Sequence, residues 1–448
     1  PGHYFLCRTY HRKRKTSARR WRPSLHRVWM FAFLRRGNGT WFGSGFQVQQ
    51  ADLPYSPAMA AYSTSIPATP DIVIIGAGVV GLWCALKAKQ RGLRAVVVDK
   101  GRIGQGASGG ILGALMPHRP VSWEDIQAFQ LEALLSLETE VAQLEAATGI
   151  RCGYNRCGRV MPIDSDAFLA EHEQWQAGST RFWPAVSPSG KPIAWDIMRG
   201  KPESAWPALK PAFVAYSFDT LSARINPRRL LQALVGSVQP EVTIAENCPV
   251  AAISDIGEVL LADGTRLSPA KIIVAAGHES FGLLQPVLHC ELGWGIKGQA
   301  VLLRPQDRSF DDMPIIYSGG IYVIAHDGGL VAVGSTSQRY FKDTCVDEAL
   351  SQKLVQRAVE LCPGLAGAGI VEQWAGIRPR AAGRDPVVGP LPGSRNIIVA
   401  SGGFKITLGI AHKMADAALA FATDMPCELP ASFAVQQHVA NAGSPATS

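Results

Sequence analysis

Residues 71–99 constrain the fold more than any other part of this chain. The β-branched run at 71–75 predicts a short buried strand, and a helix is expected at 82–91. A second apolar run at 95–98 predicts another buried strand, which ends at Asp99. A strand, a helix and a second strand in such close succession are typical of a parallel sheet, so the expected fold class is α/β.

The turn between the first strand and the helix has the spacing of a dinucleotide site. Gly76 allows a tight turn, Gly78 lets the backbone approach a pyrophosphate at the helix N-terminus, and Gly81 lets the helix pack closely on the strand. Asp99 can accept hydrogen bonds from ribose hydroxyls. A lone G-x-G-x-x-G is weak evidence, but here every part of the unit follows in order. The cofactor contacts predicted in this unit are Gly76, Gly78, Val79, Val80, Gly81, Asp99 and Lys100.

Composition excludes several other classes of protein. The chain has 448 residues and a net charge of +8, but residues 1–58 contain 11 Lys or Arg and a single acid. The remainder is close to neutral, so no nucleic-acid partner is expected. No run of 18 apolar residues occurs, so no membrane span is expected. The 9 cysteines are scattered without zinc-ligand spacing, which predicts no metal site and favours reduced thiols.

The N-terminal segment 1–68 is expected to lie outside the fold. The favoured hypothesis is translated upstream sequence without function, because Met59 would be a natural start. An Arg-rich, acid-poor targeting leader and a nucleic-acid or membrane-surface arm remain open. The expected location is cytoplasmic, or an organellar matrix if the segment is a leader. At the other end, residues 431–448 are expected to form a loose tail.

Changes in composition predict a second lobe interleaved with the first. Residues 151–214 are rich in Pro, Trp and polar turns, and residues 290–369 contain long predicted strands. These two segments are the predicted substrate domain. The dinucleotide-binding domain is assigned to 69–150, 215–289 and 370–430, where a last strand runs into a glycine-rich turn and a helix.

These segments resemble the FAD-dependent D-amino-acid oxidase superfamily, in its glycine oxidase and sarcosine oxidase branch, from about residue 70 to about residue 420. The motifs that carry the resemblance are Gly76-x-Gly78-x-x-Gly81 with Asp99, 106–113 (similar to A-S-x-x-x-G-x-L-G), Asp263-Gly264 with 272–277, 297–299 (similar to V-K-G-Q), and 376–379 with 402–404. The last two are the most specific.

The resemblance implies a Rossmann-like FAD-binding domain of the glutathione-reductase type. An interleaved α+β substrate domain, built on a mainly antiparallel sheet, is implied with it. FAD is the implied cofactor, and it is expected to be non-covalent because residues 375–395 contain no Cys. Further implied cofactor contacts are Ala107, Ser108, Gly113, Val250, Ala276, Gly277, Gly376, Arg378, Gly402, Gly403, Phe404, Lys405, Ile406 and Thr407.

The resemblance also implies three residues at the reaction site. The arginine of G-I-R-P, which is Arg378, pairs with a substrate carboxylate in this family, and a guanidinium suits that role because it presents a rigid fork. Lys405 replaces the arginine of G-H-F-R, where it helps to hold the carboxylate or faces the flavin pyrimidine carbonyls. Tyr322 matches a tyrosine of V-Y-x-V-P-R, but Ala325 and His326 depart from that motif, which leaves the substrate open.

The implied activity is oxidation of the C–N bond of a small amine or amino acid that carries a carboxylate. Hydride transfer to flavin N5 and hydrolysis of the imine are expected, with oxygen or another electron acceptor. The alternatives are a dehydrogenase that passes electrons to a quinone or a partner protein, and a non-catalytic flavoprotein subunit. No side-chain base is evident, because the candidate histidines are isolated in the sequence, and the oligomeric state is left open.

Overall fold

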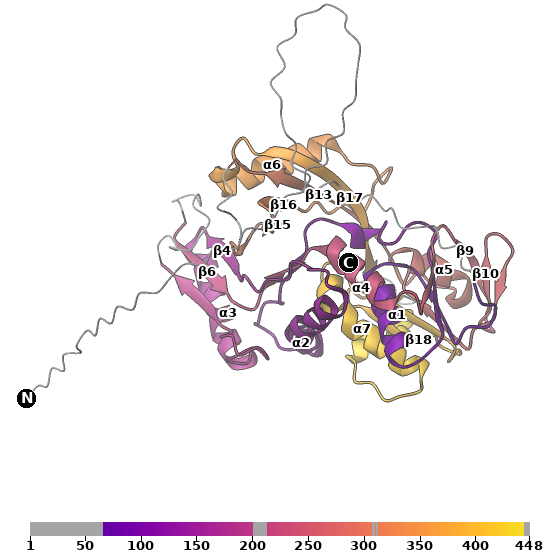
Figure 1. Ribbon diagram of the computed structural model, residues 1–448. Coiled ribbons are helices and arrows are strands. Elements are labelled where there is room, and N and C mark those ends of the chain that lie inside the picture. The colour runs from indigo at the N-terminus through magenta and orange to yellow at the C-terminus, as the bar shows by residue number, and fades with distance from the viewer. Residues whose placement is uncertain (1–65, 200–212, 307–309, 311, 443–448) are drawn as a thin grey trace, which may run out of the picture. The chain divides into compact units, whose positions relative to one another are not determined.

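The computed structural model describes residues 66–199, 213–306, 310 and 312–442 (Figure 1). The expected N-terminal segment therefore lies outside the described residues, apart from its last three positions. Within the described ranges no helix has both the length and the apolar character needed to cross a bilayer. The cysteines in these ranges are all free thiols.

A six-stranded sheet contains the N-terminal unit. Its strand order is β18 (Val387–Pro390), β19 (Ile397–Ser401), β12 (Lys271–Val274), β1 (Ile72–Ile75), β2 (Ala95–Val98) and β8 (Thr243–Ala245). All neighbours are parallel except β18, which is antiparallel to β19. The Rossmann-like α/β fold expected from the sequence is thus confirmed.

Both faces of this sheet are covered, which explains why its strands are continuously apolar. Ile72 and Ile74 face a helical layer, whereas Val73 and Ile75 face the opposite side. The helical layer consists of α1 (Val79–Gln90), α2 (Asp125–Thr148), α4 (Pro227–Val238) and α7 (Thr407–Ala422). The opposite layer consists of β9 (Val250–Ile253), β10 (Val259–Leu261), β11 (Arg266–Leu267) and α5 (Glu279–Leu288).

A second, eight-stranded sheet is mainly antiparallel. Its order is β17 (Gly369–Ala381), β13 (Gly293–Arg304), β16 (Leu330–Gly334), β15 (Ile321–His326), β14 (Ile315–Ser318), β4 (Arg159–Ile163), β6 (Ala215–Asp219) and β5 (Trp195–Met198). Only the β4–β14 pair is parallel. A helix that the sequence did not predict, α3 (Asp166–Phe182), packs beside β4 and β5, and two short strands, β3 (Ala114–Leu115) and β7 (Ala223–Arg224), pair nearby.

The two faces of the eight-stranded sheet have different neighbours. Val323 and Val331 face α6 (Glu348–Leu361), which packs on β13, β15 and β16 and lies above β16 in Figure 1. Ile324 and Ala332 point to the other face, where they pack against the segment that contains β3. We call this second side the inner face, because it is turned toward the parallel-sheet part of the molecule.

The structure differs from the expected domain limits at two strands. β6 begins at residue 215, and all of β17 after its first residue, 370–381, lies in segments assigned to the dinucleotide-binding domain, yet both strands belong to the eight-stranded sheet. These displacements arise because hydrogen-bonding partners, which local pattern does not specify, decide the sheet to which a strand belongs.

The expected loose tail is wrong for residues 431–442. A 3₁₀ turn at Ala431–Phe433 leads into α8 (Val435–Ala442). The Phe433 side chain is fully buried, and its ring contacts Phe129 of α2 edge-on. Phe433 therefore anchors the C-terminal segment on the helical layer, while His438 of α8 donates to the Pro386 carbonyl just before β18. Neither contact is visible in the local sequence.

Candidate active site

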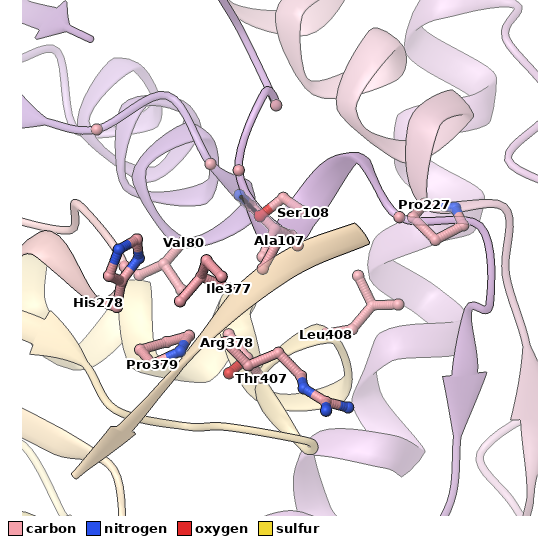
Figure 2. Close-up of a pocket in the computed structure, with 18 of the residues that line it drawn as sticks. Val80, Ala107, Ser108, Pro227, His278, Ile377, Arg378, Pro379, Thr407 and Leu408 are labelled. Atoms are coloured by element: carbon pink, nitrogen blue, oxygen red, sulfur yellow. Dashed lines mark hydrogen bonds between the residues drawn. The ribbon is translucent and has the colours of Figure 1, made fainter. Parts of the chain in front are cut away.

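A cavity of about 1140 Å³ lies between the carboxyl ends of the parallel strands and the inner face of the eight-stranded sheet. Residues from α1, the 104–114 loop, β17 and the start of α7 converge on it in Figure 2. Small-molecule sites usually measure roughly 300–1,000 Å³. The cavity is therefore large enough for a dinucleotide together with a small second molecule.

The glycine turn before α1 provides a cradle without side chains. Gly76 has φ of +110°, and a methyl group there would lie 2.6 Å from the Ala275 carbonyl oxygen, so no other residue fits. A methyl group at Gly78 would meet only Ser108 within 4 Å and would otherwise fill the cavity. Gly81 does not line the cavity; a methyl group there would overlap the Gly76 carbonyl oxygen, so it packs the helix on the turn.

Polar groups surround this cradle. The Val79 N–H, at the N-terminus of α1, donates to Ser108 Oγ over 2.9 Å. The Asp99 carboxylate lines the cavity and accepts from the N–H groups of Ala77 at 2.6 Å and Gly101 at 2.8 Å. A helix N-terminus, an unobstructed glycine and an acid at the end of β2 are what the ADP half of FAD requires. The residues present therefore fit this cofactor.

Most of the other predicted cofactor contacts also lie on this cavity. They are Gly76, Val80, Lys100, Ala107, Gly113, Val250, Ala276, Gly277, Gly376, Gly402, Phe404, Lys405, Ile406 and Thr407. Gly403 does not line it, because it faces α7, where a methyl group would lie 2.7 Å from Thr407 Oγ1. Location on the cavity does not test the individual roles, which stay predictions.

Arg378 is brought to the same cavity by the register of β17 on β13. Residues 372–380 pair with 294–302 without interruption, so alternate residues share one face. Leu302 packs with the inner-face cluster, and its partner Glu372 is therefore on the inner face. By alternation Trp374, Gly376, Arg378 and Arg380 also point inward.

The Arg378 guanidinium is held at its edge, but none of the described residues provides a counter-ion. Nη1 donates to Ser335 Oγ at 3.1 Å, and Nη2 donates to the Thr336 carbonyl at 2.6 Å. Nε is buried and unpartnered, and no carboxylate of the described residues lies within ion-pair distance. Burial lowers the pKa of Arg378 below its ordinary value, while Tyr322 opposes this. An ion pair with an acid of the described chain is thus not its role.

Tyr322 and Lys405 complete this end of the cavity. Burial raises the pKa of Tyr322 to about 12, so its phenol keeps its proton and can donate. Burial lowers the pKa of Lys405, and the charges of Arg378 and Arg380 lower it further. The Phe404 ring lies among these cations, 5.2 Å from Arg378 Cζ and 5.8 Å from Lys405 Nζ.

The four isolated histidines divide into two pairs. His118 and His278 line the cavity, and burial lowers the pKa of both, which favours their neutral forms. His326 does not line it; its Nε2 donates to the carbonyls of Ile111 and Leu112 at 3.1 and 3.0 Å. His412 lies 2.9 Å from Ser136 Oγ in the helical layer. The second pair is structural.

Several lining residues had no assigned role in the sequence. Ser335 lines the cavity and follows β16 without any motif; its neighbour Thr336, outside the lining, also holds Arg378. Trp374 lines the cavity and occupies the space that side chains at Gly110 and Gly376 would take. For Gly298 the sequence did offer a clue, because this residue lies in the V-K-G-Q-like motif. In the structure it pairs with Gly376 of the neighbouring strand.

The fold and the cavity together define a two-part, dinucleotide-binding oxidoreductase. The chain belongs to the FAD dependent oxidoreductase (DAO) family, whose model matches residues 71–417. FAD is therefore its cofactor, and the chain is an FAD-dependent oxidoreductase.

Known proteins of this family agree with the branch expected from the motifs. The chain is 29% identical to glycine oxidase of Pseudomonas putida over 352 residues, which cover 76% of this chain and 91% of the relative. It is 26% identical to glycine oxidase of Geobacillus kaustophilus, over 75% of this chain and 88% of the relative. The crystal structure of the latter superposes with a TM-score of 0.74 at 20% identity, covering 82% and 99% of the two chains. An iminodiacetate oxidase from Chelativorans has the same fold, with a TM-score of 0.71 at 20% identity over 80% and 97%.

Proposed function

We propose that this enzyme oxidises the C–N bond of a small amine or amino acid that carries a carboxylate. The observation that carries the proposal is Arg378, a largely buried guanidinium on the cofactor cavity whose Nε is fully enclosed and which has no acidic partner in the described residues. A buried cation is costly unless an anion compensates it. The substrate carboxylate is the anion we assign to it.

The geometry of the guanidinium supports this assignment. A guanidinium has five N–H donors, and Ser335 and Thr336 accept from only two. The remaining donors are sufficient for a two-pronged contact with a carboxylate. Because the two protein contacts fix the plane of the group, substrate binding requires little further ordering.

The remaining side chains orient the substrate and control its charge. FAD, when bound, supplies the acceptor for the hydride that leaves the carbon next to the amine nitrogen. Tyr322 is a protonated phenol at neutral pH and donates a hydrogen bond, while Lys405 adds positive charge on the same side. We assign no side-chain base, because an amine that binds deprotonated needs none. The imine product then hydrolyses in water.

Relatives and fold are consistent with this proposal, since glycine oxidases are among the curated relatives. We assign FAD to the parallel-sheet part and the substrate to the inner face of the eight-stranded sheet. A dehydrogenase that delivers electrons to a quinone or a protein is the alternative, and the reoxidation step below separates it from an oxidase.

The proposal is tested by anaerobic mixing of the yellow holoenzyme with a panel of amines and amino acids. We expect loss of the flavin absorbance near the visible maximum with carboxylate-bearing amines, and little loss with their esters or amides. Admission of air then restores the colour rapidly in an oxidase and slowly in a dehydrogenase. Bleaching by amines irrespective of a carboxylate would contradict the role of Arg378.

A further inference from the structure

We propose that the site contains a second anion-binding position, formed by Arg380 together with Lys405, and that the preferred substrate is an amine with two carboxylates. The inference rests on the proposed function, because it takes the first carboxylate to be the one on Arg378. It adds the class of substrate, which the first carboxylate alone does not specify.

The first observation is a group of three cations around one aromatic ring. The centroid of the Phe404 ring lies 4.7 Å from Arg380 Cζ, 5.2 Å from Arg378 Cζ and 5.8 Å from Lys405 Nζ. Phe404, Arg378 and Lys405 line the cavity, and Arg380 lies beside them at its edge, outside the lining itself. The backbone brings these residues together, because Arg380 and Gly403 form a β-bridge next to the ring.

The second observation is the lack of compensation. Lys297 and Arg228, which lie near the same strands, are matched by Asp343 and Glu372. By contrast, no carboxylate in the described ranges lies within 4.0 Å of the three cations around Phe404. Each of the three has a lowered pKa, for which burial is the largest cause. One substrate carboxylate offsets a single unit of this charge, which leaves positive charge available for a second anionic group.

The third observation is that positive charge continues outward along the same face. Arg380 follows Arg378 by two residues and pairs in register with Trp294 of β13. The Arg339 guanidinium stacks on the Trp294 ring at 4.2 Å. Alternate residues of a strand are separated by about 7 Å. That spacing suits two carboxylates a few bonds apart on one small molecule.

A matched pair of amines tests the proposal on the holoenzyme. Iminodiacetate and N-ethylglycine share an N-carboxymethyl amine, but N-ethylglycine has a methyl group in place of the second carboxylate. We expect the wild type to show a higher kcat/KM for iminodiacetate. The Arg380→Gln variant should lower the iminodiacetate-to-N-ethylglycine ratio about tenfold, the value of one charge-assisted hydrogen bond.

The control variant is Arg395→Gln, which removes an exposed arginine before β19, at the sheet end opposite the cavity. It should leave the ratio unchanged. The ionic-strength dependence of the wild-type enzyme provides a second check. Added NaCl should reduce kcat/KM for iminodiacetate more steeply than for N-ethylglycine, because salt screens the attraction between the partly exposed cations and the second carboxylate.

Binding without turnover provides an independent readout. Thiodiacetate has two carboxylates and (ethylthio)acetate has one, and both have sulfur in place of the amine nitrogen, so neither can be oxidised as an amine. Their affinities are measured by calorimetry. Tighter binding of thiodiacetate that is lost in Arg380→Gln supports the proposal. Equal ratios in the wild type and Arg380→Gln would overturn it while leaving the role of Arg378 intact. If neither amine bleaches the flavin while other carboxylate-bearing amines do, this proposal alone fails; if no carboxylate-bearing amine of the panel does, the proposed function itself fails.

Discussion

Arg378 and Gly298 occupy adjoining space on neighbouring strands. A methyl group at Gly298 of β13 would lie 2.5 Å from Nη2 of Arg378 and 2.7 Å from its Cζ. Real Cβ atoms do not approach other atoms so closely, so the guanidinium keeps its position only because residue 298 has no side chain. The glycine of the V-K-G-Q-like motif thus leaves the space in which the arginine of the G-I-R-P motif places its guanidinium.

Gly298→Ala should therefore displace the Arg378 guanidinium from Ser335 and Thr336. We expect kcat/KM for a carboxylate-bearing amine to fall by about tenfold or more, since a charge-assisted contact contributes roughly 1.5–3 kcal/mol. The flavin content should be retained. Gly282→Ala is the matched control, because a methyl group there meets nothing within 4 Å. Equal kinetics for the two variants would show that Arg378 tolerates the displacement.

Arg378→Ala should have a larger effect than Gly298→Ala. Removing one partner of a buried charge pair costs roughly 3–5 kcal/mol, so kcat/KM should fall by about two to three orders of magnitude or more. Arg378→Lys should recover only part of the loss, because an ammonium lacks the two-pronged geometry. Steady-state kinetics on an acid and on its amide provide the check. A fully active Arg378→Ala enzyme would overturn the carboxylate assignment.

Gly78→Val should yield a protein without flavin. The added side chain would project into the cavity beside Ser108, where the pyrophosphate is expected, whereas the fold does not need this glycine. The ratio of flavin absorbance to protein absorbance after purification measures the effect. Gly369→Val, at an open position at the start of β17, should keep its flavin. A yellow Gly78→Val protein would place the pyrophosphate elsewhere.

Acid precipitation of the wild type should leave FAD in the supernatant. The expectation follows from the absence of Cys in residues 375–395. Absorbance of the two fractions decides the matter, and flavin in the washed pellet would reveal a covalent bond at another residue.

Stability should decline as the pH falls from about 6.5 toward 4. Burial lowers the pKa of His172 and His326 to about 4 and that of His412 to about 3. In this window the unfolded chain takes up protons that the folded chain does not, so each pH unit costs up to about 1.4 kcal/mol per histidine. Thermal unfolding with saturating FAD should show a falling Tm.

His326→Gln should show a weaker pH dependence of Tm than the wild type. The glutamine amide can still donate to the carbonyls of Ile111 and Leu112, but it has no group that titrates. Identical slopes for the variant and the wild type would mean that His326 does not contribute to acid lability.

The local sequence pattern was sufficient to predict those elements that a few neighbouring residues specify. The strand at 71–75 and the glycine turn were visible because apolar runs and glycine spacing express what a buried strand and a tight turn need. The helix start differed by three residues, because α1 already begins at Val79, directly after the extended Gly78. The helices α3 and α5 were missed; Pro286 within α5 argues against a helix by propensity alone.

The sequence by itself determined the class of fold and the cofactor turn, because each depends on residues close together in the chain whose spacing and types specify it. The arginine expected to bind a carboxylate was indicated by the resemblance of 376–379 to a family motif. Tertiary structure alone decided that β17 pairs with β13, and hence that Arg378 and Arg380 share a face with Gly298 opposite. It also decided that Ser335 and Thr336 hold the guanidinium and that no acid in the described residues neutralises it. These relations join residues about 40 or more positions apart, and strand register, which sets them, is a property of the whole sheet.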